Sequence, residues 1–104
     1  MSVPFIASVA IGAVEALTDQ QFVAAGPKAV AAILRARFPD QHPLLVGEHL
    51  HYAGLLVRSA SEAAAQVQAG SLSQVQAMAK LQSGYSDFPS QSVERALTYG
   101  LQRA

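Results

Sequence analysis

The stretch LLVGEHLHYAGLLVRSASEAAAQVQ, residues 44–68, decides the fold because it lacks proline and repeats apolar residues at intervals of three and four. This spacing is typical of one face of an α-helix, so we predict a single long helix from Leu44 to Gln68. Its heptad-like seam consists of Leu50, Ala53, Val57, Ala60, Ala64 and Val67, and the adjacent stripe consists of Leu45, His49, Tyr52 and Leu56.

Small residues recur along another line of this predicted helix, where Gly47, Gly54 and Ser61 are seven residues apart. A glycine inside a helix costs about 1 kcal/mol relative to alanine. Close approach of another helix would compensate for that cost, so we expect an interface here and a homodimer. The candidate interface residues are Gly47, Leu50, Tyr52, Gly54, Leu56, Val57 and Ser61.

Glycine and proline divide the rest of the chain into shorter helices. We place them at residues 4–17, 18–26, 27–38, 71–83 and 91–102. Thr18, Ser71 and Ser90 are the expected N-caps, and Gly84 is the expected residue after the fourth of these helices. Strand patterns are nearly absent. The sequence therefore predicts an all-α fold, a compact bundle of five or six helices around one long central helix, in a single domain spanning residues 1–104.

The predicted helix at 71–83 has an apolar face of Leu72, Val75, Met78 or Ala79, and Gln82, which we expect to face the core. For the last helix the expected inward residues are Val93, Ala96, Leu97, Gly100 and Leu101. Tyr85 and Phe88, in the loop between these two helices, are expected to anchor that loop onto the core.

Composition narrows the possible functions. Alanine occupies 20 of 104 positions and buries little area per residue, which favours association with a second copy. Seven basic residues balance seven acidic ones, so nucleic acid is not an expected partner. The absence of cysteine excludes disulfides and thiolate chemistry. The apolar stretch from Val3 to Val14 lacks a preceding basic region and is too short to span a bilayer, so we expect a cytoplasmic protein.

The three histidines, His42, His49 and His51, lie close together with Glu48 among them. Metal-binding pairs on a helix usually stand four residues apart, whereas His49 and His51 are two apart and point in opposite directions. No nucleophile motif, phosphate-binding loop or close pair of carboxylates accompanies them. We therefore expect no metal, no cofactor and no enzymatic activity.

The main alternative is a helix-turn-helix DNA-binding regulator formed by residues 18–38. Gly26 would supply the turn, and Lys28, Arg35 and Arg37 would approach the DNA. However, this second helix consists mostly of alanine and branched apolar residues and lacks the polar side chains that read base edges. The chain as a whole also carries no excess positive charge, so its attraction to the DNA phosphates would be weak.

The leading interpretation is a non-enzymatic protein–protein interaction module, of a small regulator, inhibitor, immunity or adaptor type, that docks a helical face. Apolar anchors supply most of the affinity in such modules. The candidates are Tyr52, Leu56, Phe88 and Tyr99. Arg58 and Glu62, four residues apart, are expected to form an exposed ion pair.

Overall fold

A computed structural model describes residues 4–103, which form six α-helices and no strand. This confirms the predicted all-α bundle. The helices are α1 (Ala7–Leu17), α2 (Gln20–Ala24), α3 (Pro27–Arg37), α4 (Pro43–Gln68), α5 (Gln74–Gly84) and α6 (Ser90–Arg103). None of the helices in this part of the chain is both long enough and apolar enough to cross a membrane.

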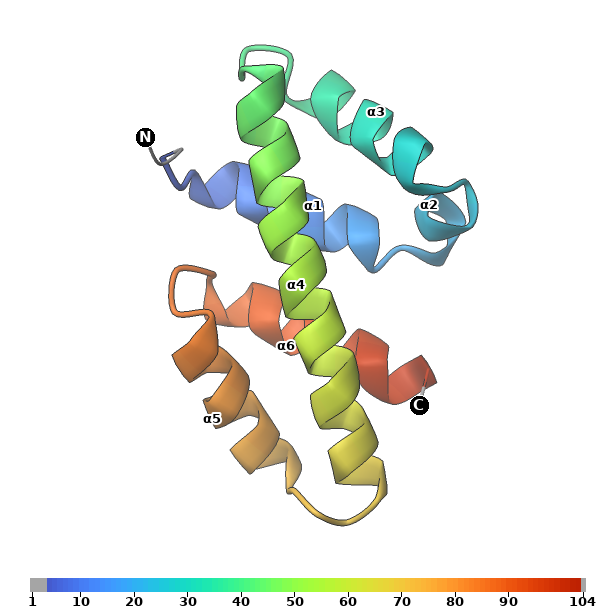
Figure 1. The fold of residues 1–104 in the computed structure, drawn as a ribbon, viewed down its shortest axis with the longest axis vertical. Coiled ribbons are helices and arrows are strands. Elements are labelled where there is room, and N and C mark those ends of the chain that lie inside the picture. Colours follow the sequence, from blue (N-terminus) through green and yellow to red (C-terminus); the bar gives the residue numbers. More distant parts are fainter. Residues whose placement is uncertain (1–3, 104) are drawn as a thin grey trace.

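Helix α4 runs the length of the molecule and packs against α1, α3, α5 and α6. Figure 1 shows α1 and α6 crossing behind it, with α3 beside its N-terminal half and α5 beside its C-terminal half. The Cα positions extend 43 × 30 × 19 Å, so the molecule is flat. The side of α4 that faces the viewer in Figure 1 carries no other helix.

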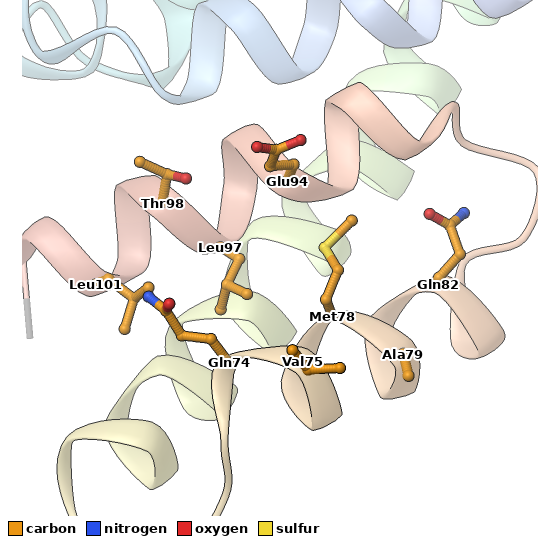
Figure 2. Close-up of a pocket in the computed structure, with 9 residues that line it drawn as sticks. All are labelled: Gln74, Val75, Met78, Ala79, Gln82, Glu94, Leu97, Thr98 and Leu101. Atoms are coloured by element: carbon orange, nitrogen blue, oxygen red, sulfur yellow. The ribbon is translucent and has the colours of Figure 1, made fainter.

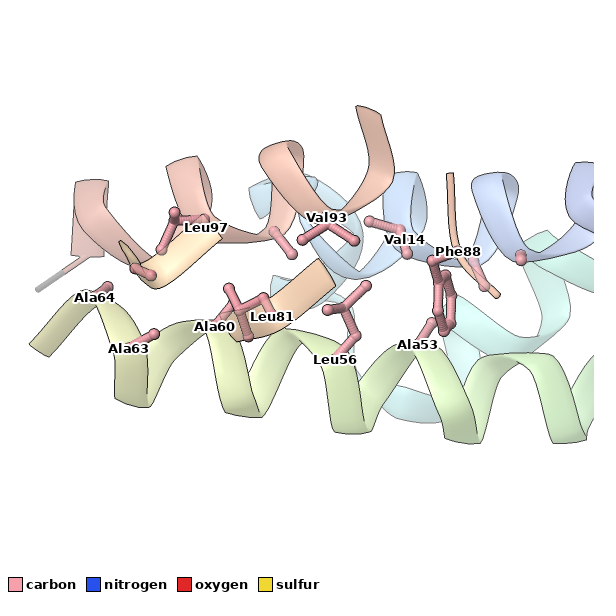
Figure 3. Close-up of a cluster of buried hydrophobic side chains, with 14 of the residues drawn as sticks. Val14, Ala53, Leu56, Ala60, Ala63, Ala64, Leu81, Phe88, Val93 and Leu97 are labelled. Atoms are coloured by element: carbon pink, nitrogen blue, oxygen red, sulfur yellow. The ribbon is translucent and has the colours of Figure 1, made fainter. Parts of the chain in front are cut away.

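The core lies between α4 and the helices behind it, and alanine supplies much of it (Figure 3). Ala53, Ala60 and Ala64 are fully buried on α4, as the predicted seam requires. Small side chains let α6 come close: a Cβ added to Gly100 would lie 3.1 Å from the Ala60 carbonyl oxygen. Larger residues from several helices and from the α5–α6 loop fill the remaining space, among them Val14, Leu34, Leu56, Leu81, Phe88 and Val93.

The N-cap of α2 differs from the prediction. Asp19, rather than Thr18, caps this helix: its Oδ1 accepts from the backbone N–H groups of Gln21 at 2.9 Å and Phe22 at 3.4 Å. The Thr18 hydroxyl instead donates to the Val14 carbonyl oxygen at 2.7 Å, and Thr18 ends α1. A threonine hydroxyl can bond back to the preceding turn, and the Thr18 Oγ1 accepts from the Arg95 Nε at 2.8 Å rather than from a backbone N–H of α2.

The junction of α4 and α5 also shifts by two residues. Gly70 ends α4, as predicted, with φ at +80°. The backbone N–H of Ser71 donates to the Gln66 carbonyl oxygen at 2.9 Å, which completes a Schellman motif. Because Ser71 completes the end of α4, the N-cap of α5 is Ser73 rather than Ser71. Ser73 and Gln76 form a reciprocal capping box.

Other helix ends differ from the sequence-based expectation by one to three residues, and three of them are explained by local contacts. Helix α1 begins at Ala7 rather than Pro4, because the backbone of Ile6 is extended; the Ile6 N–H donates to the His49 Nε2. Gly84 is the last residue of α5, and Tyr85 is its C-cap. Ser90 is the first residue of α6 rather than its N-cap. The backbone N–H groups of Ser92 and Val93 donate to the Pro89 carbonyl oxygen. The expected apolar stretch from Val3 begins outside the described residues.

Candidate functional site

An open groove lies between α5 and α6 and has a volume of about 550 Å³. We call it the α5–α6 groove. Its apolar lining comes from Val75, Met78, Ala79, Leu97 and Leu101, and its polar lining from Gln74, Gln82, Glu94 and Thr98 (Figure 2). A concave, mostly apolar surface with a few polar groups is the usual form of a binding site.

The way α5 packs on α4 leaves the groove open. Ala77 and Leu81 are buried, one helical turn apart, and they hold α5 against α4. Val75 and Ala79 therefore lie on the opposite, solvent-facing side of α5. On α6, Val93, Ala96, Leu97 and Gly100 are buried, and Leu97 and the partly buried Leu101 extend toward α5 (Figure 2).

Val75 is the most exposed large apolar side chain among the described residues, at 79% of its full surface. The sequence pattern predicts Val75 in the core, and this prediction is wrong. An i, i+4 pair of smaller and larger residues, Ala77 and Leu81, faces the core instead. The expected inward face of α6 is confirmed, with Leu101 partly buried at the edge.

One end of the groove contains a polar group that lacks a hydrogen-bond partner. The Gln82 Nε2 donates to the Phe88 carbonyl oxygen at 3.3 Å, and its buried Oε1 accepts no hydrogen bond. Met78 lies in the middle of the groove and points toward α6 (Figure 2). Methionine adapts its shape readily to a binding partner. The carboxylate of Glu94, the charged side chain in the lining, points away from α5 in Figure 2.

The predicted interface residues on α4 do not share one surface. Leu56 is fully buried within the chain and has no surface to offer a partner. Leu50 and Val57 are partly buried against the core. The remaining residues are uncovered, since Tyr52 is 44% exposed, nothing lies within 4 Å of a Cβ added to Gly47 or Gly54, and Ser61 is exposed. However, Tyr52 and Gly54 are two residues apart and therefore lie on opposite flanks of α4.

The four candidate anchors divide in the same way. Phe88, at 5% exposure, and Leu56 belong to the core, whereas Tyr52 is exposed and Tyr99 is partly so. Tyr85 and Phe88 do anchor their loop, as expected: the Tyr85 hydroxyl donates to the Leu55 carbonyl oxygen at 3.1 Å.

The predicted Arg58–Glu62 pair does not form. Within residues 4–103 the ion pair is Arg37–Glu15, at 3.3 Å.

The three histidines have separate environments. His49 is 2% exposed and connects two helices: its Nε2 accepts from the Ile6 N–H at 2.8 Å, and its Nδ1 lies 2.8 Å from the Leu45 carbonyl oxygen. His42 caps α4 by accepting from the Leu44 N–H at 3.1 Å. His51 is exposed. The described residues contain no group of three metal-ligating side chains.

The basic residues of the DNA-binding alternative do not converge. Lys28, Arg35 and Arg37 are all exposed on α3. Arg37 lies nine residues after Lys28, roughly half a helical turn around α3 from it. Its guanidinium also pairs with Glu15 on α1. Helix α2, the first helix of the proposed motif, has only five residues. This arrangement leaves no single basic face.

The α5–α6 groove was not found from the sequence, because all of its apolar residues fit an ordinary core pattern. The capping box Ser73-x-x-Gln76 marks where α5 begins, but no local pattern shows that Val75 faces outward. Comparison of the chain with family models, curated proteins and solved structures found no match.

Proposed function

We propose that this protein is a non-enzymatic interaction module that binds an apolar helical segment of a partner protein in the α5–α6 groove. The observation that carries the proposal is the exposure of Val75 beside a groove lined by Met78, Leu97 and Leu101. An amphipathic helix that docks in such a groove inserts apolar side chains spaced three, four and seven residues apart.

The composition of the groove supports protein binding over chemistry. The centre of a protein interface is depleted of charged residues and enriched in methionine and large apolar side chains. The groove contains one charged residue, Glu94, at its edge. It contains no histidine and no potential nucleophile other than the Thr98 hydroxyl. An acid–base pair of the kind used in hydrolysis is therefore not part of this surface.

Photo-crosslinking in the native host tests the proposal. A photoreactive benzoylphenylalanine at position 75 should form a covalent adduct with a protein, identified by mass spectrometry. The matched control carries the same residue at position 83, an exposed serine of α5 outside the groove lining. Adducts at position 75 and few at position 83 support the proposal. No adduct at position 75, or equal yields at both positions, would contradict it.

A further inference from the structure

We propose that His49 is a pH-sensitive latch, which holds residues 4–6 against α4 while its imidazole is neutral and releases them when the imidazole is protonated. The segment is extended where it meets α4, with Ile6 at φ −114° and ψ 111°. The Ile6 N–H donates to the His49 Nε2 at 2.8 Å and so ties the segment to α4. His49 does not line the α5–α6 groove, so this proposal is independent of the proposed function.

The hydrogen bonds of His49 require a neutral ring. Its Nε2 accepts from the Ile6 N–H and therefore carries no proton. Its Nδ1 lies 2.8 Å from the Leu45 carbonyl oxygen, which can only accept, so the proton of the ring is on Nδ1. A protonated imidazole has two N–H donors and no acceptor. Protonation of Nε2 would therefore place a second donor against the Ile6 N–H and remove this hydrogen bond.

Burial keeps water from solvating a protonated ring while the segment is in place. His49 is 2% exposed, and the ring of Phe5 packs over it with the two centroids 5.4 Å apart. A buried charge without a hydrogen-bond partner is costly, whereas release of residues 4–6 opens the ring to water. The face of Phe5 attracts a cation, which offsets part of this cost but supplies no acceptor for the Ile6 N–H. Protonation therefore favours the released state.

The surroundings of His49 contain no carboxylate that would hold a protonated ring in place. Its hydrogen-bond and aromatic partners are Phe5, Ile6 and Leu45, none of which has a titratable side chain. Within residues 4–103, no carboxylate oxygen lies within 4.0 Å of its ring nitrogens. The titratable and charged groups of the surrounding elements are exposed or bonded elsewhere: His42, Glu48 and His51 on α4, Tyr85 and Asp87 in the loop before α6, Glu94 and Arg95 on α6, and the Glu15–Arg37 pair of α1 and α3.

Release of residues 4–6 would change the surface beside the start of α6. Phe5 packs edge-on against Phe88, with ring centroids 5.4 Å apart. Phe88 is only 5% exposed while Phe5 is in this position. Departure of the segment uncovers one side of Phe88 together with the ring of His49. The latch therefore links acidification to the exposure of a core aromatic side chain.

Fluorine NMR of the full chain with para-fluorophenylalanine at position 5 tests the latch, because the fluorine reports whether the segment is docked or released. Between about pH 8 and about pH 5, where histidine changes charge, the ratio of docked to released chains should fall as the pH falls. The limit for one proton is about tenfold per pH unit. Circular dichroism should stay constant over this range, because the helices remain folded.

His49→Gln is the main variant, because glutamine has both an amide acceptor and an amide donor but does not ionise. It should abolish the pH dependence of the fluorine signal. His51→Gln makes the same change at an exposed histidine two residues away. His42→Asn removes the third histidine and retains an acceptor for the N-terminus of α4. Both of these control variants should retain the pH dependence.

The latch is supported if the ratio depends on pH in the wild type and in both controls but not in His49→Gln. A wild-type ratio that stays constant over the whole pH range overturns it, as does a dependence that persists in His49→Gln. Loss of the dependence in His51→Gln or His42→Asn also overturns it, because another histidine would then be the sensor. A fall in helical signal in step with the fluorine change would show unfolding of the whole chain and would equally overturn it.

Discussion

At the scale of single residues, glycines that look alike in the sequence have opposite roles. Gly54 and Gly100 both lie inside helices. Nothing lies within 4 Å of a Cβ added to Gly54, whereas a Cβ at Gly100 would meet the Ala60 carbonyl oxygen at 3.1 Å and the Ala64 Cβ at 3.2 Å. Glycine is therefore a packing requirement at position 100 and only a cost to the helix at position 54.

Alanine substitution should expose this difference. Gly100→Ala forces α4 and α6 apart at a backbone contact and should lower the free energy of unfolding by about 1–3 kcal/mol. Gly54→Ala removes the helix penalty of glycine and should raise it by about 0.5–1 kcal/mol. Urea denaturation followed by circular dichroism measures both. Equal changes of the same sign would show that the α4–α6 approach is looser than described.

His49 is a structural residue that links the start of α1 to α4. His49→Leu leaves the Ile6 N–H without its acceptor and should lower the free energy of unfolding by about 1–3 kcal/mol. His51→Leu, two residues away and exposed, is the matched control and should change it by less than about 0.5 kcal/mol. If the two variants are equally stable, the Ile6–His49 hydrogen bond contributes nothing to stability.

At the scale of helices, the sequence predicts which segments are helical more accurately than it predicts the residues at which each helix begins and ends. The long helix and its neighbours follow from apolar spacing and from the proline and glycine residues between them. The ends of α1 and α4 depend on competition for single backbone groups. Thr18 bonds backward to Val14, and the Ser71 N–H bonds to Gln66, so the caps move to Asp19 and Ser73. A local pattern does not determine which of two neighbouring polar residues caps the helix.

The groove could not be predicted from the sequence for a related reason. A helix with apolar residues on several sides can bury more than one combination of them. In α5 the choice of Ala77 and Leu81 leaves Val75 exposed, and that choice depends on the shape of α4 and α6. Among the residues predicted for an interface on α4, Leu56 is fully buried in the chain's own core, which the apolar pattern does not distinguish from an exposed anchor.

The true cap of α5 can be identified by paired substitutions. Ser73→Ala removes the side-chain acceptor for the Gln76 N–H and should lower the free energy of unfolding by about 1 kcal/mol. Ser71→Ala should change it by less than about 0.5 kcal/mol, because Ser71 contributes its backbone N–H, which alanine retains. Thermal or urea unfolding distinguishes the two, and the reverse order would mean that α5 begins at residue 71.

At the scale of the whole molecule, a flat bundle with an alanine-rich core has more surface than a compact monomer of the same mass. The exposed surface is apolar and recessed at α5 and α6, whereas the outer side of α4 carries exposed charged residues. This contrast between the two surfaces is the basis of the binding role proposed for the α5–α6 groove.

Methyl NMR of the labelled chain tests the central claim directly, because it reports on each surface separately. On transfer from buffer to an extract of the native host, we expect the methyl resonances of Val75, Met78, Leu97 and Leu101 to shift together. Those of Leu44 and Leu55, exposed on α4, should remain fixed. Shifts confined to the α4 methyl groups, or no shifts in the extract, would contradict the assignment of the α5–α6 groove as the binding site.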